Sequence, residues 1–374
     1  MVSFALKTLF SDRGKLLIAL AGVVFSLILV NVQGGLYFGL IKKASLLTDH
    51  CGADIWVSHR LVESVDFAYD IPETRLNRIR GLPGVKEAEP YLVGKGIATL
   101  PDEGYEDVWI IGFDPKTMLG AEWPFVEGSR SDLLRPDAIS IDELDAHKLG
   151  FAKIGDTLEV NGHRARVVAK TRGMLGFVTT PYLFATIDTA RRLSGIPDGY
   201  CSYFLVRTEP DTDLQQLSAV IRKQLPEMDV YTSDELGKLS QEYFLGRTGI
   251  GVSFGAATSL GLLVGLLMVA QSLYASALDH LADYATLKAI GADGRQLALV
   301  VVSQALLIAL LGSVIGVALV LLIQHYFSSP IAPIEIPPEL LGGGIVLVFG
   351  ICLAATVLPL LRIRSVDPVT VLQG

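Results

Sequence analysis

Residues 16–30 read LLIALAGVVFSLILV, and residues 297–323 read LALVVVSQALLIALLGSVIGVALVLLI. An α-helix needs about 20 apolar residues to cross the hydrocarbon core of a bilayer, and runs of this length are too long for buried helices of a soluble protein. Two further stretches lack Asp, Glu, Lys and Arg over a similar length. Together they predict four membrane spans, at 16–41, 248–278, 296–324 and 340–361.

The first stretch has one alternative interpretation, a secretory signal peptide. Its apolar run is long for a signal peptide, and no small-residue cleavage site follows, because the chain continues NVQGGLYFGLIKK. We therefore interpret 16–41 as a membrane span.

The charges are concentrated in one segment of the chain. The 374 residues are 51% apolar with a mean hydropathy of +0.46, and only 19% are charged. Residues 42–247 hold 24 basic and 32 acidic residues. This split predicts a water-facing domain between the first and second spans.

The basic residues outside this domain predict its side of the membrane. They are Lys7, Arg13, Lys15, Lys288, Arg295, Arg362 and Arg364. All seven lie on one side if there are four spans, and the short loop at 325–339 carries only Glu335 and Glu339. By the positive-inside rule, both termini and the 279–295 loop are cytoplasmic, in a cytoplasmic (inner) membrane, and the 362–374 tail is cytoplasmic too. The 42–247 domain is then extracytoplasmic.

Short strands alternate with helices in this domain. The pattern predicts a helix at 72–84, a strand at 85–99, a strand then a helix at 137–150, and a helix at 211–225. Residues 156–171 predict a hairpin that turns at Asn161-Gly162. The fold class is therefore an α-helical membrane protein with an α+β extracytoplasmic domain of two lobes.

The domain returns to the membrane through TSDELGKLSQEYFLG, residues 232–246. Thr232 with Glu235 three residues later is a capping-box signal. Leu236, Leu239 and Tyr243 form one apolar stripe behind it. We expect this helix to run into the second span and to pair with an outward extension of the first, which makes a stalk between domain and membrane.

Residues 1–15 place Val2, Leu6, Leu9 and Phe10 at helical spacing among basic residues. They predict either an amphipathic helix along the inner membrane surface or an extension of the first span.

Small residues and cysteines allow further contacts. Gly261 and Gly265 in the second span, and Gly312 and Gly316 in the third, stand at small-xxx-small spacing. Such pairs let helices approach closely, at a dimer seam or within one subunit. Cys51 and Cys201 both lie in the extracytoplasmic domain, where a disulfide is permitted.

The 279–295 loop predicts a short helix. Leu281, Tyr284, Leu287 and Ile290 recur every third residue, and Gly291 follows them as a helix C-cap does. A short helix parallel to the inner surface suits a cytoplasmic motor subunit as a point of attachment. An ordinary helix–turn connection is the alternative.

Residues 283–291, DYATLKAIG, resemble the "REIGTLRAIGA" signature of FtsX-like ABC-transporter permeases. The tail LPLLRIRSVDPVTVL at 358–372 resembles the ending of that family, and LPGV at 82–85, IGFD at 111–114 and IGD at 154–156 resemble its extracytoplasmic domain. The N-terminal GKLLIALAGVVFSLILVNVQGG resembles most the DevC-type permeases within the MacB-type group. The chain departs from the pattern at Ala282 and Asp283, where the family usually has Arg-Glu.

This resemblance implies a homodimer bound to two copies of a separate ABC ATPase, with ATP and Mg held by that partner and no cofactor in this chain. The coupling helix would lie within Asp279–Gly291. Its contacting residues would be Leu281, Asp283, Tyr284, Thr286, Leu287, Lys288, Ala289, Ile290 and Gly291. A DevC-like permease also implies a membrane-fusion adaptor and an outer-membrane channel. The exported substrate would be a lipid, lipoprotein, peptide or hydrophobic small molecule.

The absent motifs agree with a non-catalytic subunit. The sequence contains no G-x-x-x-x-G-K-[ST], HExxH or G-x-S-x-G motif, and its six histidines are scattered. We expect no metal site, no enzyme activity and no nucleic-acid partner. The apolar parts of the spans carry no ionisable residue, which argues against a proton-coupled carrier or an ion channel.

An FtsX-like signal transmitter that activates an extracytoplasmic cell-wall hydrolase is the alternative function. The length of the segment between the first two spans, 42–247, favours the exporter type over the smaller domain of division-type FtsX proteins.

Overall fold

A computed structural model describes residues 8–177 and 179–364. The chain divides into two compact units, a membrane unit of Met1–Gly39 with Gly249–Gly374, and a domain of Leu40–Thr248. Each unit has its own hydrophobic core and is described by itself.

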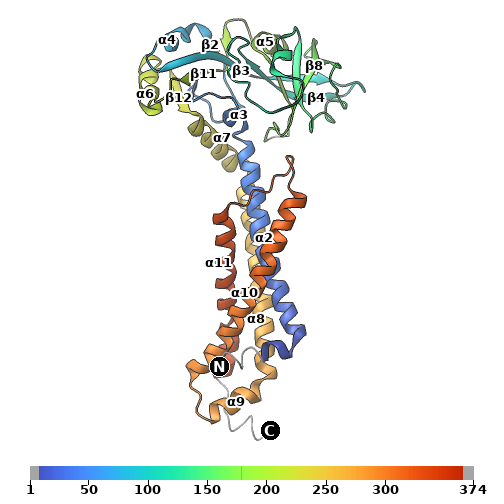
Figure 1. The fold of residues 1–374 in the computed structure, drawn as a ribbon, viewed down its shortest axis with the longest axis vertical. Coiled ribbons are helices and arrows are strands. Elements are labelled where there is room, and N and C mark those ends of the chain that lie inside the picture. Colours follow the sequence, from blue (N-terminus) through green and yellow to red (C-terminus); the bar gives the residue numbers. More distant parts are fainter. Residues whose placement is uncertain (1–7, 178, 365–374) are drawn as a thin grey trace. The chain divides into compact units, whose positions relative to one another are not determined.

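The described part of the membrane unit is entirely helical outside its connections, and its long helices lie side by side (Figure 1). Its helices are α2 (Arg13–Lys43, whose last residues belong to the domain), α8 (Ile250–Asp279), α9 (Leu281–Ala289), α10 (Gly294–Phe327), α11 (Pro338–Ala355) and α12 (Val357–Arg364). Among the described residues, four segments are long and apolar enough to cross a membrane: Arg13–Lys43, Ile250–Asp279, Gly294–Phe327 and Pro338–Ile363. They contain most of each predicted span.

Two helix boundaries fall within predicted elements, and one of them has a clear local cause. The fourth candidate span is interrupted at Thr356, where α11 ends and α12 begins. Pro359 lacks the N–H that would bond to the carbonyl of Ala355, so an unbroken ladder of helical hydrogen bonds is impossible there. Of the predicted N-terminal helix, residues 1–7 lie outside the described residues, whereas 8–11 are helical and Asp12 separates them from α2.

The four predicted packing glycines all face α2 of the same chain. A Cβ atom on each would lie within 3 Å of a side-chain atom of α2. The neighbours are Leu29 for Gly261, Ser26 for Gly265, Val23 for Gly312 and Leu27 for Gly316. In addition, Ser26 Oγ donates a 2.9 Å hydrogen bond to the carbonyl of Gly261. This arrangement corresponds to packing within one subunit, the second of the two alternatives.

The domain is built on a ten-stranded sheet with the order β12-β1-β11-β3-β4-β9-β6-β8-β5, and β7 pairs with β3 and β8. The strands are β1 (Ile55–His59), β3 (Val85–Thr99), β4 (Tyr105–Phe113), β5 (Phe125–Glu127), β6 (Ala138–Asp142), β7 (Thr157–Val160), β8 (His163–Thr171), β9 (Tyr182–Thr186), β11 (Tyr203–Thr208) and β12 (Met228–Thr232), with β2 (Ile71–Pro72) and β10 (Tyr200–Cys201) as a separate pair.

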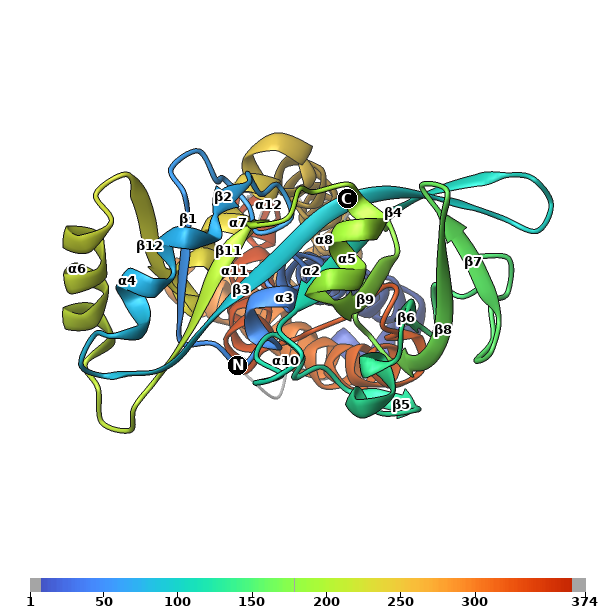
Figure 2. The same cartoon turned by 90° about the horizontal axis from the view of Figure 1, so that it is seen from above.

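One long strand, β3, belongs to both lobes, and Figure 2 shows it running between them. Its first half pairs with β11 in the first lobe, an open sheet with the strands β12, β1 and β11 that we call the open lobe. Its second half pairs with β4 and, at Ala98 and Thr99, with β7. The strands β3, β4, β9, β6, β8 and β7 thereby close into a ring, which makes the second lobe a small barrel.

Short helices cover the lobes. They are α3 (Leu46–Asp49), α4 (Asn77–Arg80), α5 (Ile187–Ser194), α6 (Leu214–Gln224) and α7 (Ser233–Thr248), with 3₁₀ turns at Glu73–Arg75 and Arg130–Leu134. The predicted strand at 85–99, the hairpin turn at Asn161-Gly162 and the helix within 211–225 are confirmed.

The two faces of the sheet bury separate cores. Side chains alternate between the faces along each strand, so Val57 and Phe204 enter one core, whereas Trp56 and Tyr203 enter the other. Trp56 lies edge-on to Tyr203, with ring centroids 5.2 Å apart.

The separation of the two cores contradicts the suggested disulfide between Cys51 and Cys201. Cys51 and Cys201 are both free thiols, fully buried in different cores. Cys201 belongs to the core on the Val57 face. Cys51 belongs to the core on the other face, which contains Trp56 and which we call the Trp56 core. Burial raises the pKa of each thiol to about 12, so neither carries an appreciable thiolate fraction at neutral pH.

Three other predictions about local structure are confirmed only in part. Residues 143–150, after β6, form turns rather than a helix, and residues 72–84 form a 3₁₀ turn and one short helix. The helix predicted to run from the stalk into the second span is interrupted at Gly249, whose φ of 66° lies in the left-handed region. Gly249 separates α7 from α8 at the boundary between the two units.

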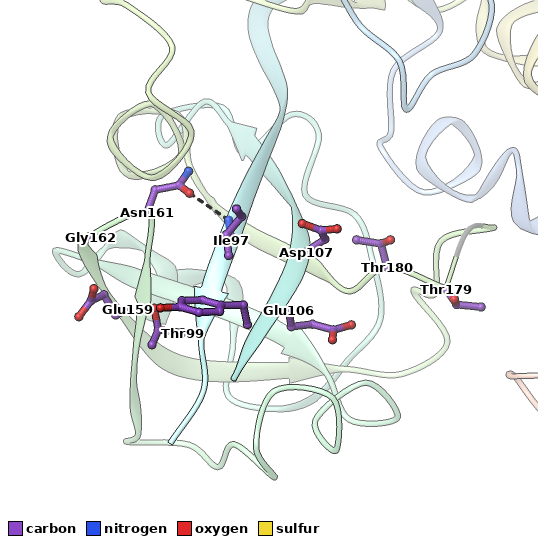
Figure 3. Close-up of a pocket in the computed structure, with 10 residues that line it drawn as sticks. Ile97, Thr99, Glu106, Asp107, Glu159, Asn161, Gly162, Thr179 and Thr180 are labelled. Carbon is purple, nitrogen blue, oxygen red and sulfur yellow. Dashed lines mark hydrogen bonds between the residues drawn. The ribbon is translucent and has the colours of Figure 1, made fainter. Parts of the chain in front are cut away.

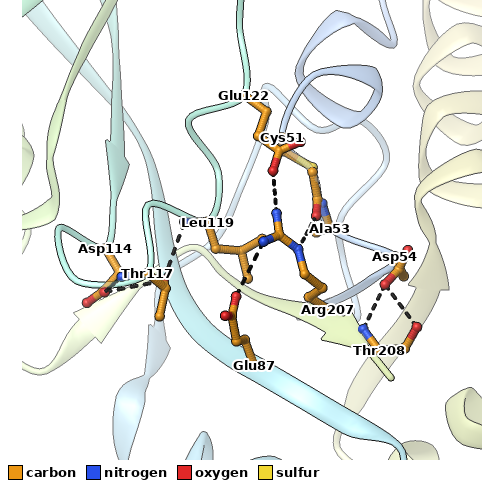
Figure 4. Close-up of polar contacts among 11 residues, drawn as sticks. Cys51, Ala53, Asp54, Glu87, Asp114, Thr117, Leu119, Glu122, Arg207 and Thr208 are labelled. Atoms are coloured by element: carbon orange, nitrogen blue, oxygen red, sulfur yellow. Dashed lines mark hydrogen bonds and ion pairs between the residues drawn. The ribbon is translucent and has the colours of Figure 1, made fainter. Parts of the chain in front are cut away.

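Arg207 joins the start of β1 to the rest of the open lobe (Figure 4). Its guanidinium pairs with Glu122 and Glu87 and donates a 3.1 Å hydrogen bond to the carbonyl of Gly52. On the next residue, the backbone N–H of Thr208 donates to Asp54 at 2.7 Å. These contacts hold the segment that enters the domain from α2 against β11.

We expect Gly265→Ala to destabilise the membrane unit, because its Cβ would lie 1.8 Å from Ser26 Oγ. Overpacking of this kind costs about 1–3 kcal/mol. Size-exclusion chromatography of the heated, detergent-solubilised protein measures the loss of folded material. Gly255→Ala in the same helix is the control, since nothing lies within 4 Å of its Cβ position. Equal melting of the two variants would contradict the packing described here.

Candidate functional site

The predicted coupling segment forms the separate helix α9 between α8 and α10. His280 lies between α8 and α9, and its Nδ1 is 2.9 Å from Asp283 Oδ2. The chain turns at Gly291, whose φ of 95° favours glycine. Asp293 then caps α10 in a capping box with Gln296. The sequence therefore ends α8 before this two-turn helix and begins α10 after it.

Only part of the predicted stripe faces the protein. Tyr284 is 2% exposed, and Leu287 packs partly buried beside it, in a cluster with α10 and α12. Ile290 is instead 77% exposed, and Leu281 is half-buried. The outward surface of the segment consists of Ala282, Asp283, Thr286, Ala289, Ile290 and Gly291.

Residues 8–15, which include the start of α2, contact α8 and α10, the helices before and after α9. Lys15 Nζ pairs with Asp279, the last residue of α8, and its backbone carbonyl accepts a 2.6 Å hydrogen bond from Ser272. Thr8 Oγ1 accepts a 2.8 Å hydrogen bond from Gln304 of α10. The predicted amphipathic segment thus contributes to the position of α9, a role that its own pattern did not indicate.

The predicted stalk residues lie on α7, the last helix of the domain. Glu235 and Thr232 form the expected capping box, with hydrogen bonds of 2.9 Å and 3.2 Å. Leu236 is fully buried in the Trp56 core, and Leu239 and Tyr243 are half-buried. Ser240 accepts a 2.9 Å hydrogen bond from the backbone of Val65. Helix α7 is therefore packed into the domain rather than attached at one end.

Aromatic rings extend the contact of α7 into the sheet. The Phe67 ring lies 5.4 Å from Tyr243, 6.2 Å from Phe244 and 5.8 Å from Trp109 on β4, between ring centroids. Phe244 stacks on Phe177 at 4.2 Å. No sequence pattern predicts the role of Phe67, because this residue lies in the irregular segment between β1 and β2.

Next to Phe67, Asp66 is a buried acid. Its side chain accepts a 2.6 Å hydrogen bond from the Tyr182 hydroxyl. Burial raises the pKa of Asp66 to about 6, although the hydrogen bond from Tyr182 acts in the opposite direction. A carboxyl group buried without a basic partner is costly, which makes it a candidate functional residue.

A large pocket of the domain lies outside the barrel wall, beside the hairpin of β3 and β4 (Figure 3). It has a volume of about 820 Å³ and includes Glu106, Asp107 and Glu159. Within residues 8–177 and 179–364, no group of three His, Cys, Asp or Glu side chains is placed to hold a metal ion.

Architecture and patterning together define a class, a multi-pass membrane protein with a large α+β domain between its first and second spans. Comparison with known families then gives the family. Residues 16–224 match the MacB-like periplasmic core domain, and residues 255–368 match the FtsX-like permease C-terminal region. The chain belongs to the MacB-like, FtsX-like ABC transporter permeases, so its domain is extracytoplasmic.

Relatives match along the whole chain. An uncharacterized ABC transporter permease of Mycobacterium tuberculosis is 28% identical over 384 residues and covers 100% of both chains. A second permease so described, from Mycobacterium bovis, is 26% identical over 390 residues with the same coverage.

Two solved structures match about half of the chain. The periplasmic region of MacB from Actinobacillus actinomycetemcomitans has a TM-score of 0.39 at 11% identity, covering 51% of this chain and 94% of that one. The extracellular domain of the noncanonic ABC-type transporter YknZ from Gram-positive bacteria has a TM-score of 0.36 at 16% identity, covering 48% and 98%.

We expect Asp66→Asn to stabilise the protein at pH 7.5 and to leave its stability unchanged near pH 4. A carboxyl pKa raised in the folded state means that the folded protein holds the proton more tightly than the unfolded chain. The stabilisation from that proton is complete below about pH 4 and is lost as the pH rises through about 6. The asparagine avoids this loss, which is at most roughly 3 kcal/mol.

Thermal unfolding of the full chain in detergent, between pH 4 and 8, measures this effect. The groups around Asp66 are the hydroxyls of Tyr182, Tyr91 and Tyr203 and the nearby Lys95 and Asp70. Asp198→Asn at an exposed position is the control. A stability difference between wild type and Asp66→Asn that does not vary with pH would refute the assignment.

Proposed function

We propose that this permease is the membrane subunit of an ABC export complex, driven by a separate cytoplasmic ATPase that docks on Asp279–Gly291. The main support is the surface of α9. Ile290 is a large apolar residue with 77% of its surface exposed, beside exposed Thr286 and Ala289 and the acidic Asp283. A small apolar patch with one charge at its edge suits a protein groove. The partner would hold ATP and Mg.

The buried half of α9 supports force transfer. Tyr284 and Leu287 pack in the same cluster as Val300 and Val301 of α10. A push on the exposed face would therefore be passed to α10 through close-packed side chains. In this proposal Tyr284 and Leu287 serve as the internal attachment, and Ile290 serves as the contact with the motor.

The complex we propose contains two copies of this chain and two of the ATPase, with both termini of the permease in the cytoplasm. On the extracytoplasmic side, α7 with Leu236, Leu239 and Tyr243 would carry the motion into the sheet, since its inner face lies within the domain core. A membrane-fusion adaptor and an outer-membrane channel would complete the path.

Export of a lipid, lipoprotein, peptide or hydrophobic small molecule is favoured over activation of a cell-wall hydrolase. The observation in its favour is the match of residues 16–224 to the MacB-like periplasmic core domain, which includes most of both lobes. The hydrolase-activating alternative requires no pocket in the domain, whereas the barrel lobe has several.

The coupling proposal predicts that Ile290→Asp abolishes co-purification of the ATPase and leaves the permease folded in the membrane. The change places a charge in an apolar contact and touches none of the buried cluster. Affinity purification of the tagged permease, followed by quantification of the bound ATPase, measures the effect.

The matched control is Ile154→Asp, an exposed isoleucine of the domain. It should retain the ATPase at the wild-type level. Leu287→Asp is a poorer test, because Leu287 packs against the buried cluster and its replacement would also disturb folding. Wild-type retention of the ATPase by Ile290→Asp would rule out α9 as the docking helix.

A further inference from the structure

On the face of β3 and β4 that contributes to the Trp56 core, side chains are buried in the first part of β3 and exposed in its last part. On β3, Tyr91 and Val93 are buried in the Trp56 core, but Lys95 and Ile97, which point to the same face, are exposed. Trp109 of β4 stands directly opposite Lys95 in the antiparallel ladder. The core therefore ends at Lys95 and Trp109, and side chains beyond this point face solvent.

Two pockets flank this edge of the core. One has a volume of about 350 Å³ and the other about 250 Å³, and both are lined by Phe67, Lys95 and Trp109. The smaller one shares Asp107 and Thr180 with the large pocket of Figure 3, where both residues are labelled. A ligand of moderate size could therefore contact the rings of Phe67 and Trp109 and extend into either pocket.

The ammonium group of Lys95 contacts the rings of Trp109 and Phe67. Its ammonium nitrogen lies 4.9 Å from the centroid of Trp109 and 5.3 Å from that of Phe67. This is the geometry of a cation–π contact. In the described part of the chain, no carboxylate lies within ion-pairing distance of Lys95. The ring pair is therefore what holds this cation in place.

The charged groups of the two pockets are mostly acidic. Asp66 and Asp70 line the larger pocket, Asp107 lines the smaller one, and Lys95 is the one basic residue in either lining. Asp66 is only 2% exposed, and its side chain accepts its hydrogen bond from a neutral hydroxyl rather than from a basic group. A buried carboxylate beside an aromatic surface favours a positively charged ligand over an anion.

We propose that Phe67, Trp109 and Asp66 form a binding site for an organic cation with an apolar body, such as a quaternary or protonated amine. Lys95 occupies the site when it is empty, with its ammonium where the ligand cation binds. The ligand displaces that ammonium from the rings, and its apolar part fills the adjoining pocket. The carboxylates of Asp66 and Asp70 offset the added charge.

The position of Phe67 gives the site a route to the rest of the domain. Its ring contacts both Trp109 and the α7 residues Tyr243 and Phe244. A ligand on one side of the ring therefore changes the packing of α7 on the other side. This last step rests on the proposed function, whereas binding of the cation does not.

Equilibrium dialysis of radiolabelled benzyltrimethylammonium against the full chain in a neutral detergent tests the site, with empty micelles as the blank.

Trp109→Leu should weaken binding about tenfold, the size expected for loss of a partly desolvated cation–π contact. Asp66→Asn should weaken it several-fold and still melt as a folded protein. Lys95→Ala should strengthen it several-fold, because the internal competitor is gone. Lys116→Ala, at an exposed lysine elsewhere in the domain, should bind as the wild type does.

Two further probes fix the sign of the charge. Neutral N-benzylacetamide and anionic phenylacetate should bind at least tenfold more weakly than benzyltrimethylammonium. Preferential binding of phenylacetate that Lys95→Ala abolishes would overturn the proposal, since Lys95 would then be a ligand contact and not an occupant. Equal affinity of all variants for benzyltrimethylammonium would overturn it as well. Because no ATPase is present in these experiments, failure of the export proposal would not alter their outcome.

Discussion

Close approach of α2 to α8 and α10 is the constraint on which the membrane unit depends. In lipid the hydrophobic effect does not draw apolar helices together, so van der Waals contact and occasional hydrogen bonds must hold them. Glycines at 261, 265, 312 and 316 provide that contact, since each admits an α2 side chain where a Cβ would stand. Helix α2 is therefore the common partner of the second and third candidate spans, and its far end continues into the domain.

A comparable constraint organises the domain. Strand β3 is long enough to pair with β11 in one lobe and to join the closed ring of strands in the other. Both lobes thus share one backbone and cannot shift independently without loss of ladder hydrogen bonds. The two cores lie on opposite faces of this sheet, and α7 contributes Leu236 to one of them. Motion of α7 would consequently act on the sheet directly, which is the property that a force-transmitting domain needs.

Asp66 and Lys95 are two charged residues whose side chains pack against neutral groups, a hydroxyl for Asp66 and two aromatic rings for Lys95. Among the described residues, Asp66 is a buried acid with no basic partner, and Lys95 has no carboxylate partner. Both lie where the Trp56 core ends and the pockets begin. Natural sequences tolerate such exceptions mainly at functional sites. Their adjacency, and the contacts of Phe67 with Tyr243 and Phe244, connect the proposed cation site to α7.

The primary sequence by itself determined the four candidate spans, the intervening α+β domain, the hairpin at Asn161-Gly162 and the position of the α9 segment. These features depend on local composition and periodicity, which can be read from short stretches of the sequence. Tertiary structure alone decided which side of α9 is exposed, because Tyr284 and Leu287 face α10 while Ile290 does not. It also separated Cys51 from Cys201, because the fold buries the two thiols in different cores. Phe67, Trp109 and Asp66 are far apart or unpatterned in sequence, and only the fold brings Trp109 to the other two.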